Sequence, residues 1–217
     1  MVAEEQTHGR GRLDRTWVSP PGAGLWTSVL VRPKGQPVER LGLLSLVAGL
    51  AAVDALGDAC RVRAELKWPN DIVVVSAGCG GAGGYRKIGG ILSHAVSAET
   101  VVIGIGINVS MTSDELPVAL ASSVLLEGGA PDRAALLVAL LQRLRTRLIQ
   151  WRDDDPGLMA DYRHLCRTIG RLVDVTLPSG ATLSGLVSGV DDSGHLLVTD
   201  GESTTIVTAG DVVHASI

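Results

Sequence analysis

The hydrophobic and polar positions along the chain predict alternating strands and helices. Short runs rich in Val and Ile indicate strands, whereas longer runs rich in Leu and Ala indicate helices. The predicted strands are residues 24–31, 65–68, 72–75, 88–96 and 101–109, and the predicted helices are residues 38–56, 133–152 and 158–166. Because short turns join the strands between residues 65 and 109, we expect an α+β fold with a mixed, largely antiparallel sheet and helices packed against it.

The pattern changes after Gly170, where short Val- and Leu-rich segments are separated by the turn sequences PSG, DDSG and DG. This spacing is typical of a small antiparallel barrel. We therefore predict a larger domain of residues 1–167 followed by a barrel of residues 168–217. The acidic residues of the barrel that fall on expected turns are interpreted as solvated rather than as metal ligands; they are Asp191, Asp192 and Asp211.

A glycine-rich stretch at residues 76–86, SAGCGGAGGYR, can bury little surface. Segments of this composition behave as flexible chain. We expect it to form a flexible hairpin loop between two strands of the larger domain.

Composition excludes several classes of protein. The chain has 217 residues, is 46% hydrophobic and carries a formal net charge of -4, so it can build a core but has no bulk basic surface for nucleic acid or membranes. Its three cysteines lack CxxC spacing and its five histidines form no metal-spaced cluster. The most apolar run, residues 41–56, contains Asp54 and is too short to cross a bilayer. We expect a cytoplasmic protein.

The first candidate site is THGRGRLDRTW, near the start of the chain. Gly9 and Gly11 permit positive φ and a close approach of the backbone to a ligand, and three arginines offer forked donors for phosphate or carboxylate oxygens. The arginines are Arg10, Arg12 and Arg15. The loop can therefore cradle an anion, although a solvated basic loop or an RNA-binding GR segment fits the same residues equally well.

A second candidate site lies in ELKWPNDIVV. Lys67 sits within an apolar strand, where an ammonium is costly unless an anion pairs with it. Pro69, Asn70 and Asp71 form the tight turn that follows. This arrangement indicates an anion site, and the alternative is a hairpin whose lysine reaches water through its long side chain.

Two further segments have strand faces that lack side chains. In VVIGIGINVS, alternation places three isoleucines on one face and Gly104, Gly106 and Asn108 on the other. The segment KIGGILS, which begins at Lys87, also combines a lysine with two glycines. Glycine faces leave room for a flat group, and Asn108 offers it both a donor and an acceptor. These features indicate a ligand-binding protein rather than a purely structural one.

The motifs GRGR, KWPND, KIGGIL and GIGIN follow one another in this order. With these four motifs ahead of a small C-terminal barrel, the sequence resembles the bacterial biotin protein ligases over nearly its whole length. The resemblance implies a class II synthetase-like catalytic domain followed by an SH3-like barrel. It also implies that biotin and MgATP give biotinyl-5′-adenylate and pyrophosphate, and that a lysine of a biotin carboxyl carrier protein or domain of an acyl-CoA carboxylase then accepts biotin.

The resemblance also implies roles for individual residues. Lys67 would neutralise the biotin carboxylate and the α-phosphate, Arg12 and Arg15 would face the phosphates, and the catalytic step is assigned to Lys67 and Arg12. Asn108 and the glycine face would receive the adenine, while strand 25–31 would wall the biotin pocket. The other residues expected to contact biotin or the adenylate are Gln6, Gly9, Arg10, Gly11, Trp26, Asn70, Lys87, Gly89, Gly90, Gly104 and Gly106. No protein ligand is assigned to a metal.

The sequence differs from the family pattern ahead of the arginine loop. The family has an ST-N motif there, on a first strand and helix that this sequence lacks, and Asp14 stands where a glycine is usual. We therefore expect a start assigned too far downstream, a truncated chain or a degenerate member, with an unpaired sheet edge that favours association. Because no helix-turn-helix region precedes the loop, we expect no operator binding.

Three other functions stay open from the sequence. The first is a catalytically impaired biotin-binding or interaction module of the same family. The second is a lipoate-type acyltransferase, which should lack the GRGR loop, and the third is a nucleic-acid-binding protein, which the acidic net charge disfavours. We expect a monomer or a weak homodimer that binds neither nucleic acid nor membrane.

Overall fold

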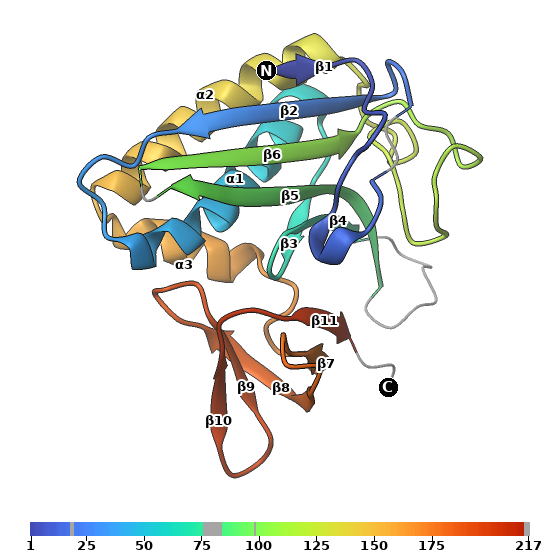
Figure 1. Cartoon of the computed structure of the whole chain (residues 1–217). Helices are drawn as coiled ribbons and strands as arrows, with labels where there is room; N and C mark the ends of the chain where they lie inside the picture. The colour runs from blue at the N-terminus through green and yellow to red at the C-terminus, as the bar shows by residue number, and fades with distance from the viewer. Residues whose placement is uncertain (18–19, 76–83, 98, 215–217) are drawn as a thin grey trace.

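The larger part of the chain folds around a six-stranded antiparallel sheet (Figure 1). The computed structural model describes residues 1–17, 20–75, 84–97 and 99–214. The strand order is β1-β2-β6-β5-β4-β3. The strands are β1 (Val2–Ala3), β2 (Gly24–Val31), β3 (Glu65–Lys67), β4 (Asp71–Val75), β5 (Tyr85–Ser97) and β6 (Thr100–Asn108). The predicted antiparallel sheet is confirmed.

The first long helix packs between the sheet and a second helix. A 3₁₀ segment (Val38–Leu43) leads into α1 (Leu44–Ala55), which ends in a π-helical turn (Leu56–Cys60). Nearly every residue of α1 is buried, because a helix in a central layer has no solvent face. By length and composition alone the segment Val38–Cys60 is long and apolar enough to cross a membrane, but 72% of its apolar 18-residue stretch is buried inside the protein. We interpret it as the core helix.

Two further helices cover the same face of the sheet (Figure 1). Helix α2 (Arg133–Arg152) begins where the Asp132 side chain accepts a hydrogen bond from Ala135 N at 3.0 Å. Its Leu136, Leu140 and Leu144, spaced four apart, are buried against α1. Helix α3 (Pro156–Leu165) follows. Both predicted helices are confirmed within about two residues of their ends.

The C-terminal part forms a separate five-stranded antiparallel sheet with the order β10-β9-β8-β7-β11. Alternating residues such as Val173 and Val175 fill its core. Within residues 172–214 the edge strands β10 and β11 do not pair with each other, so the expected barrel is an open sheet here. The boundary at 167/168 stays a prediction. The strands are β7 (Leu172–Thr176), β8 (Thr182–Val190), β9 (Leu196–Thr199), β10 (Thr204–Val207) and β11 (Asp211–His214).

The two sheets are joined through the KWPND turn. Trp68 Nε1 donates to Gly194 O at 2.9 Å, and Trp68 N donates to Thr168 Oγ1 at 3.0 Å. Arg163 Nε at the end of α3 donates to Val190 O at 2.6 Å. Because Trp68 is only 2% exposed, its indole anchors the turn against the C-terminal sheet.

Two expectations about the chain segments change in the structure. The predicted loop 76–86 is shorter, because Tyr85 and Arg86 already belong to β5; residues 76–83 lie outside the described residues. The sheet edge at β2 is partly covered, since β1 pairs Val2 with Thr27 and the N-terminal ammonium donates to Ser28 O at 2.8 Å.

Candidate functional site

A cavity of about 620 Å³ opens on the face of the large sheet opposite the helices. Its floor is a row of four cross-strand neighbours: Trp26 pairs with Gly106, Gly106 with Gly90, and Gly90 with Asp71. The isoleucines that alternate with the glycines on β6 are buried in the core beneath. The floor therefore has an indole at one end, a carboxylate at the other and bare backbone between them.

Trp17 lies over the bare part of this floor. A Cβ at Gly106 would stand 3.1 Å from its indole ring, and a Cβ at Gly90 would stand 3.2 Å from it. Trp17 also meets Trp26 edge to face, with ring centroids 6.2 Å apart. The sequence prediction missed Trp17, although the end of the arginine motif was a signal for it. The indole Nε1 atoms of both tryptophans are buried, and neither has a hydrogen-bond partner among the described residues.

The arginine loop is a short hairpin that crosses the cavity side of the sheet (Figure 1). Gly11 N donates to Arg15 O at 2.7 Å and Trp17 N donates to Gly9 O at 2.9 Å. Positive φ falls on Leu13, at 54°, and on neither glycine, so that part of the prediction is wrong. A Cβ at Gly9 would lie 2.3 Å from Trp17 O, so this glycine allows the loop to pack closely on itself. The close approach of the backbone to a ligand stays a prediction.

Two lysines enter the cavity around one carboxylate. Lys87 Nζ lies 2.5 Å from Asp71 Oδ1, and Lys67 Nζ lies 3.9 Å from Asp71 Oδ2. The Lys67 side chain is only 11% exposed, and its Nζ donates to Val212 O at 2.6 Å. Burial lowers the pKa of Lys67, while the nearby charge of Asp71 opposes that shift. Lys67 is therefore a buried cation held by a carbonyl rather than one that reaches water.

The start of strand β11 and the residue before it, Gly210, contact three of the cations in or beside the cavity. Arg12 Nη2 donates to Gly210 O at 3.0 Å, and Arg15 forms an ion pair with Asp211. Together with the bond from Lys67 to Val212 O, the consecutive residues 210–212 of the C-terminal part hold three cations. Asp211 was predicted to be a solvated turn residue, and this is wrong: it lies on β11 and faces the arginine loop.

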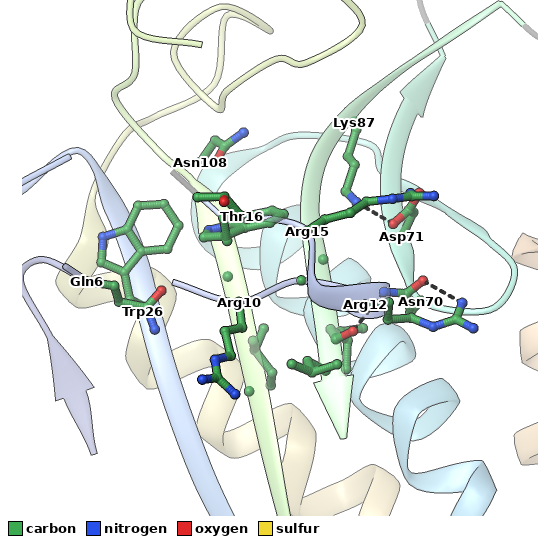
Figure 2. Close-up of a pocket in the computed structure, with 18 of the residues that line it drawn as sticks. Gln6, Arg10, Arg12, Arg15, Thr16, Trp26, Asn70, Asp71, Lys87 and Asn108 are labelled. Carbon is green, nitrogen blue, oxygen red and sulfur yellow. Dashed lines mark hydrogen bonds and ion pairs between the residues drawn. The ribbon is translucent and has the colours of Figure 1, made fainter. Parts of the chain in front are cut away.

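The turn after Lys67 connects the arginine loop to the floor (Figure 2). Asn70 Oδ1 accepts from Arg12 Nη1 at 3.4 Å, and Asn70 Nδ2 donates to Ile91 O at 2.9 Å. Burial lowers the pKa of Arg12, against the charges of Asp211 and Asp71. Because Asn70 touches both Arg12 and β5, it fixes the guanidinium relative to the sheet.

Most of the predicted site residues lie together around this cavity. Those that line it are Gln6, Arg10, Gly11, Arg12, Arg15, Trp26, Lys67, Asn70, Lys87, Gly90, Gly104, Gly106 and Asn108. Gly9 and Gly89 do not line it, and a Cβ at Gly89 would press on Gly106 O at 2.6 Å within the sheet. Of strand 25–31, Leu25, Val29 and Val31 pack on the main core instead of walling the cavity.

Asn108 lines the cavity but is also engaged elsewhere. Its side chain is buried, and its Nδ2 donates to Ser122 O at 2.8 Å. It thus ties β6 to the segment that forms another wall, which includes Pro117, Val118 and Ala121. The sequence prediction missed this wall, because the segment has no strand or helix period.

The described residues contain no group of three or more His, Cys, Asp or Glu side chains that could hold a metal ion. The cavity instead combines cationic side chains, a flat glycine floor and two indoles with unpaired donors. Cations suit phosphate and carboxylate oxygens, and a glycine floor beneath an indole suits a planar ring. Fold and site together are suited to a protein whose ligand is a nucleotide-like anion.

The comparisons with known proteins identify the family. Residues 1–108 match the biotin/lipoate A/B protein ligase family, and residues 168–215 match the biotin protein ligase C-terminal domain. The chain is 41% identical to the biotin--[acetyl-CoA-carboxylase] ligase of Mycobacterium tuberculosis, covering 99% of this chain and 78% of that protein. The chain belongs to the biotin protein ligase family.

Further relatives agree with this assignment. The biotin--[acetyl-CoA-carboxylase] ligase of Paracoccus denitrificans is 31% identical, over 98% of this chain and 88% of its own length. The structure of the biotin protein ligase from Aquifex aeolicus in complex with biotin and ATP superimposes with a TM-score of 0.81 at 26% identity, covering 99% of this chain and 88% of that one. The predicted fold class and family are confirmed.

Proposed function

We propose that this chain is an ATP-dependent biotin protein ligase that acts on the biotin acceptor domain of a carboxylase. The observation that carries the proposal is the cation cluster beside the glycine floor. Lys67, Lys87, Arg12 and Arg15 all line the cavity, where a triphosphate and a carboxylate would have to meet. The names of the relatives from M. tuberculosis and P. denitrificans, and the biotin and ATP of the A. aeolicus structure, point to the same substrates.

In the first step a carboxylate oxygen of biotin attacks the α-phosphorus of ATP, and pyrophosphate leaves with the bonding electron pair. The two reacting groups are both anions, so their approach is unfavourable without a cation between them. Lys67 supplies that charge from a buried position, where electrostatic stabilisation exceeds that in water. Arg12 and Arg15 neutralise charge on the phosphates, and Lys87 adds a cation at the far end of the floor.

The shape of the cavity supports an arrangement of the two substrates. The adenine ring fits against the glycine floor at Gly90 and Gly106 once the Trp17 indole, which covers this part of the floor, moves aside. Biotin fits the end of the floor at Trp26 and Gln6, where the unpaired indole Nε1 of Trp26 offers a donor. This arrangement directs the biotin carboxylate and the α-phosphate toward Lys67.

In the second step the amine of the acceptor lysine attacks the carbonyl carbon of the adenylate, and AMP leaves with the bonding pair. Enclosure of the mixed anhydride beneath the arginine loop keeps water away until the acceptor docks. Magnesium would enter as a partner of the ATP phosphates, whose charge it neutralises. The cytoplasmic location, the monomer or weak homodimer, and the absence of nucleic-acid binding stay predictions.

Biotin-dependent exchange of labelled pyrophosphate into ATP tests the first step without an acceptor. We expect exchange that needs biotin, ATP and Mg²⁺ together. A folded chain that shows no exchange, and binds neither biotin nor ATP by calorimetry, would contradict the proposal. Replacement of biotin by lipoate or octanoate serves as the specificity control, and we expect no exchange with either acid.

A further inference from the structure

A buried polar network lies behind the cavity wall formed by residues 117–121. Ser122 is fully buried, and its Oγ donates to Glu127 Oε1. The same carboxylate oxygen lies 2.7 Å from Nη2 of Arg86 on β5. The Glu127 side chain is only 13% exposed, and a carboxylate shared by a guanidinium and a hydroxyl is held firmly. Glu127 therefore links this segment to the start of β5.

The same segment forms hydrogen bonds with both the backbone N and the backbone O of Lys87. Lys87 N donates to Leu120 O at 2.7 Å, and Ser122 N donates to Lys87 O at 2.8 Å. The paired residues of β6 and β5 begin at Gly89, so at Lys87 residues 120–122 take the place of β6 along β5. The position of Lys87 thus depends on a segment that has no strand of its own.

Asn108 and Ser123 form hydrogen bonds that join the two ends of the segment between residues 108 and 124. Asn108 Nδ2 donates to Ser122 O at 2.8 Å, Val124 N donates to Asn108 O at 3.0 Å, and Ser123 Oγ donates to Met111 O at 2.6 Å. These bonds fix where the loop leaves and rejoins the sheet. They do not fix its contact with Arg86, which depends on Glu127.

We propose that Glu127 is a positioning residue for the nucleotide half of the site, an inference that rests on the ligase function proposed above. Glu127 does not line the cavity, so it acts through its partners: it holds Ser122 against Arg86 and thereby fixes Lys87 and the wall at 117–121. Trp26, at the expected biotin end, lies two strands away from β5. Loss of Glu127 should therefore weaken ATP binding and leave biotin binding intact.

The test compares Glu127→Ala with the isosteric Glu127→Gln and with Asp54→Ala. The amide oxygen of Gln can still accept from Ser122 and Arg86, so this variant keeps the test valid if Glu127→Ala does not fold. Asp54 is the matched control, because it forms a partly buried pair with Arg147 at 2.9 Å and does not line the cavity. The assay is pyrophosphate exchange, with separate KM values for ATP and biotin.

We expect Glu127→Ala to raise KM for ATP about tenfold, with KM for biotin and kcat within about twofold of the parent. The KM for ATP of Glu127→Gln should lie between those of the parent and Glu127→Ala. Asp54→Ala should change neither of the two KM values nor kcat. An unchanged KM for ATP, or equal changes in all three constants, overturns the inference. Calorimetry with a non-hydrolysable ATP analogue separates this inference from the proposed function. If the parent chain binds the analogue without exchanging pyrophosphate, the ligase function fails. In that case, a Glu127→Ala variant that binds the analogue as tightly as the parent refutes the positioning role.

Discussion

Substitution of Lys67 by Met should separate catalysis from stability. Met keeps the length of the side chain and removes the ammonium. One preorganised donor to developing charge contributes about 3–4 kcal/mol to transition-state stabilisation, so adenylate formation should fall by about 10²- to 10³-fold. The buried position of Lys67, with its Nζ 2.6 Å from Val212 O, places this site at the strong end of that range.

The effect of the same change on folding should be small. Burial lowers the pKa of Lys67, so the folded state carries a penalty for the ammonium at neutral pH, and Met removes it. Against this, Val212 O loses its donor, at a cost of about 1–3 kcal/mol, and Asp71 loses one of two cationic neighbours. The two effects oppose each other, and we expect the free energy of unfolding to change by less than about 2 kcal/mol.

Pyrophosphate exchange and urea denaturation measure the two quantities on the same preparations. Lys34→Met is the control, because Lys34 is an exposed lysine outside the cavity, and it should change neither quantity. Exchange by Lys67→Met within tenfold of the parent rate would refute the catalytic assignment. So would a loss of activity that matches the unfolded fraction.

Two more predictions concern the glycine floor and His214 of β11, whose ring meets that of Tyr85 on β5 edge to face with centroids 5.2 Å apart. Gly106→Ala would place a Cβ 3.1 Å from the Trp17 ring and should raise KM for ATP several-fold. Gly104→Ala is the control, because its Cβ would meet only Leu92 O at 3.4 Å, and it should leave KM for ATP unchanged. Equal effects of the two substitutions on KM for ATP would contradict a stacking role for the floor. Burial lowers the pKa of His214 to about 4, so the unfolded chain binds the proton first as pH falls from about 6.5, and up to about 3 kcal/mol of stability should be lost by pH 4. His214→Phe should flatten that part of the pH profile of urea unfolding, and an unchanged slope would show that His214 is not its source.

The periodic parts of the fold could be predicted from the sequence. Strand β2 and helix α2 have the predicted ends, because β-branched runs and a four-residue leucine spacing report burial directly. The glycine face of β6 could also be predicted, since alternation alone separates Gly104 and Gly106 from the isoleucines.

The rest of the site depends on contacts between distant parts of the chain. Arg12 and Gly210 are 198 residues apart, and no local pattern indicates that β11 holds the site cations. Asp211 was misread for this reason. Glu127 and Ser122 lie in a segment without period, whose position is set by side-chain and backbone bonds to β5. Pattern reasoning identified which residue types bind an anion, but not which neighbours orient them.

The most direct test of the account is detection of the adenylate itself. The purified chain is mixed with biotin and MgATP, quenched, and the extract is examined for biotinyl-5′-adenylate by mass spectrometry, with the Lys67→Met variant in parallel. The account predicts biotinyl-5′-adenylate in the parent sample, formed only when both substrates are present, and at least about a hundredfold slower formation by the variant. A folded parent chain that binds biotin and ATP but forms no adenylate would contradict it.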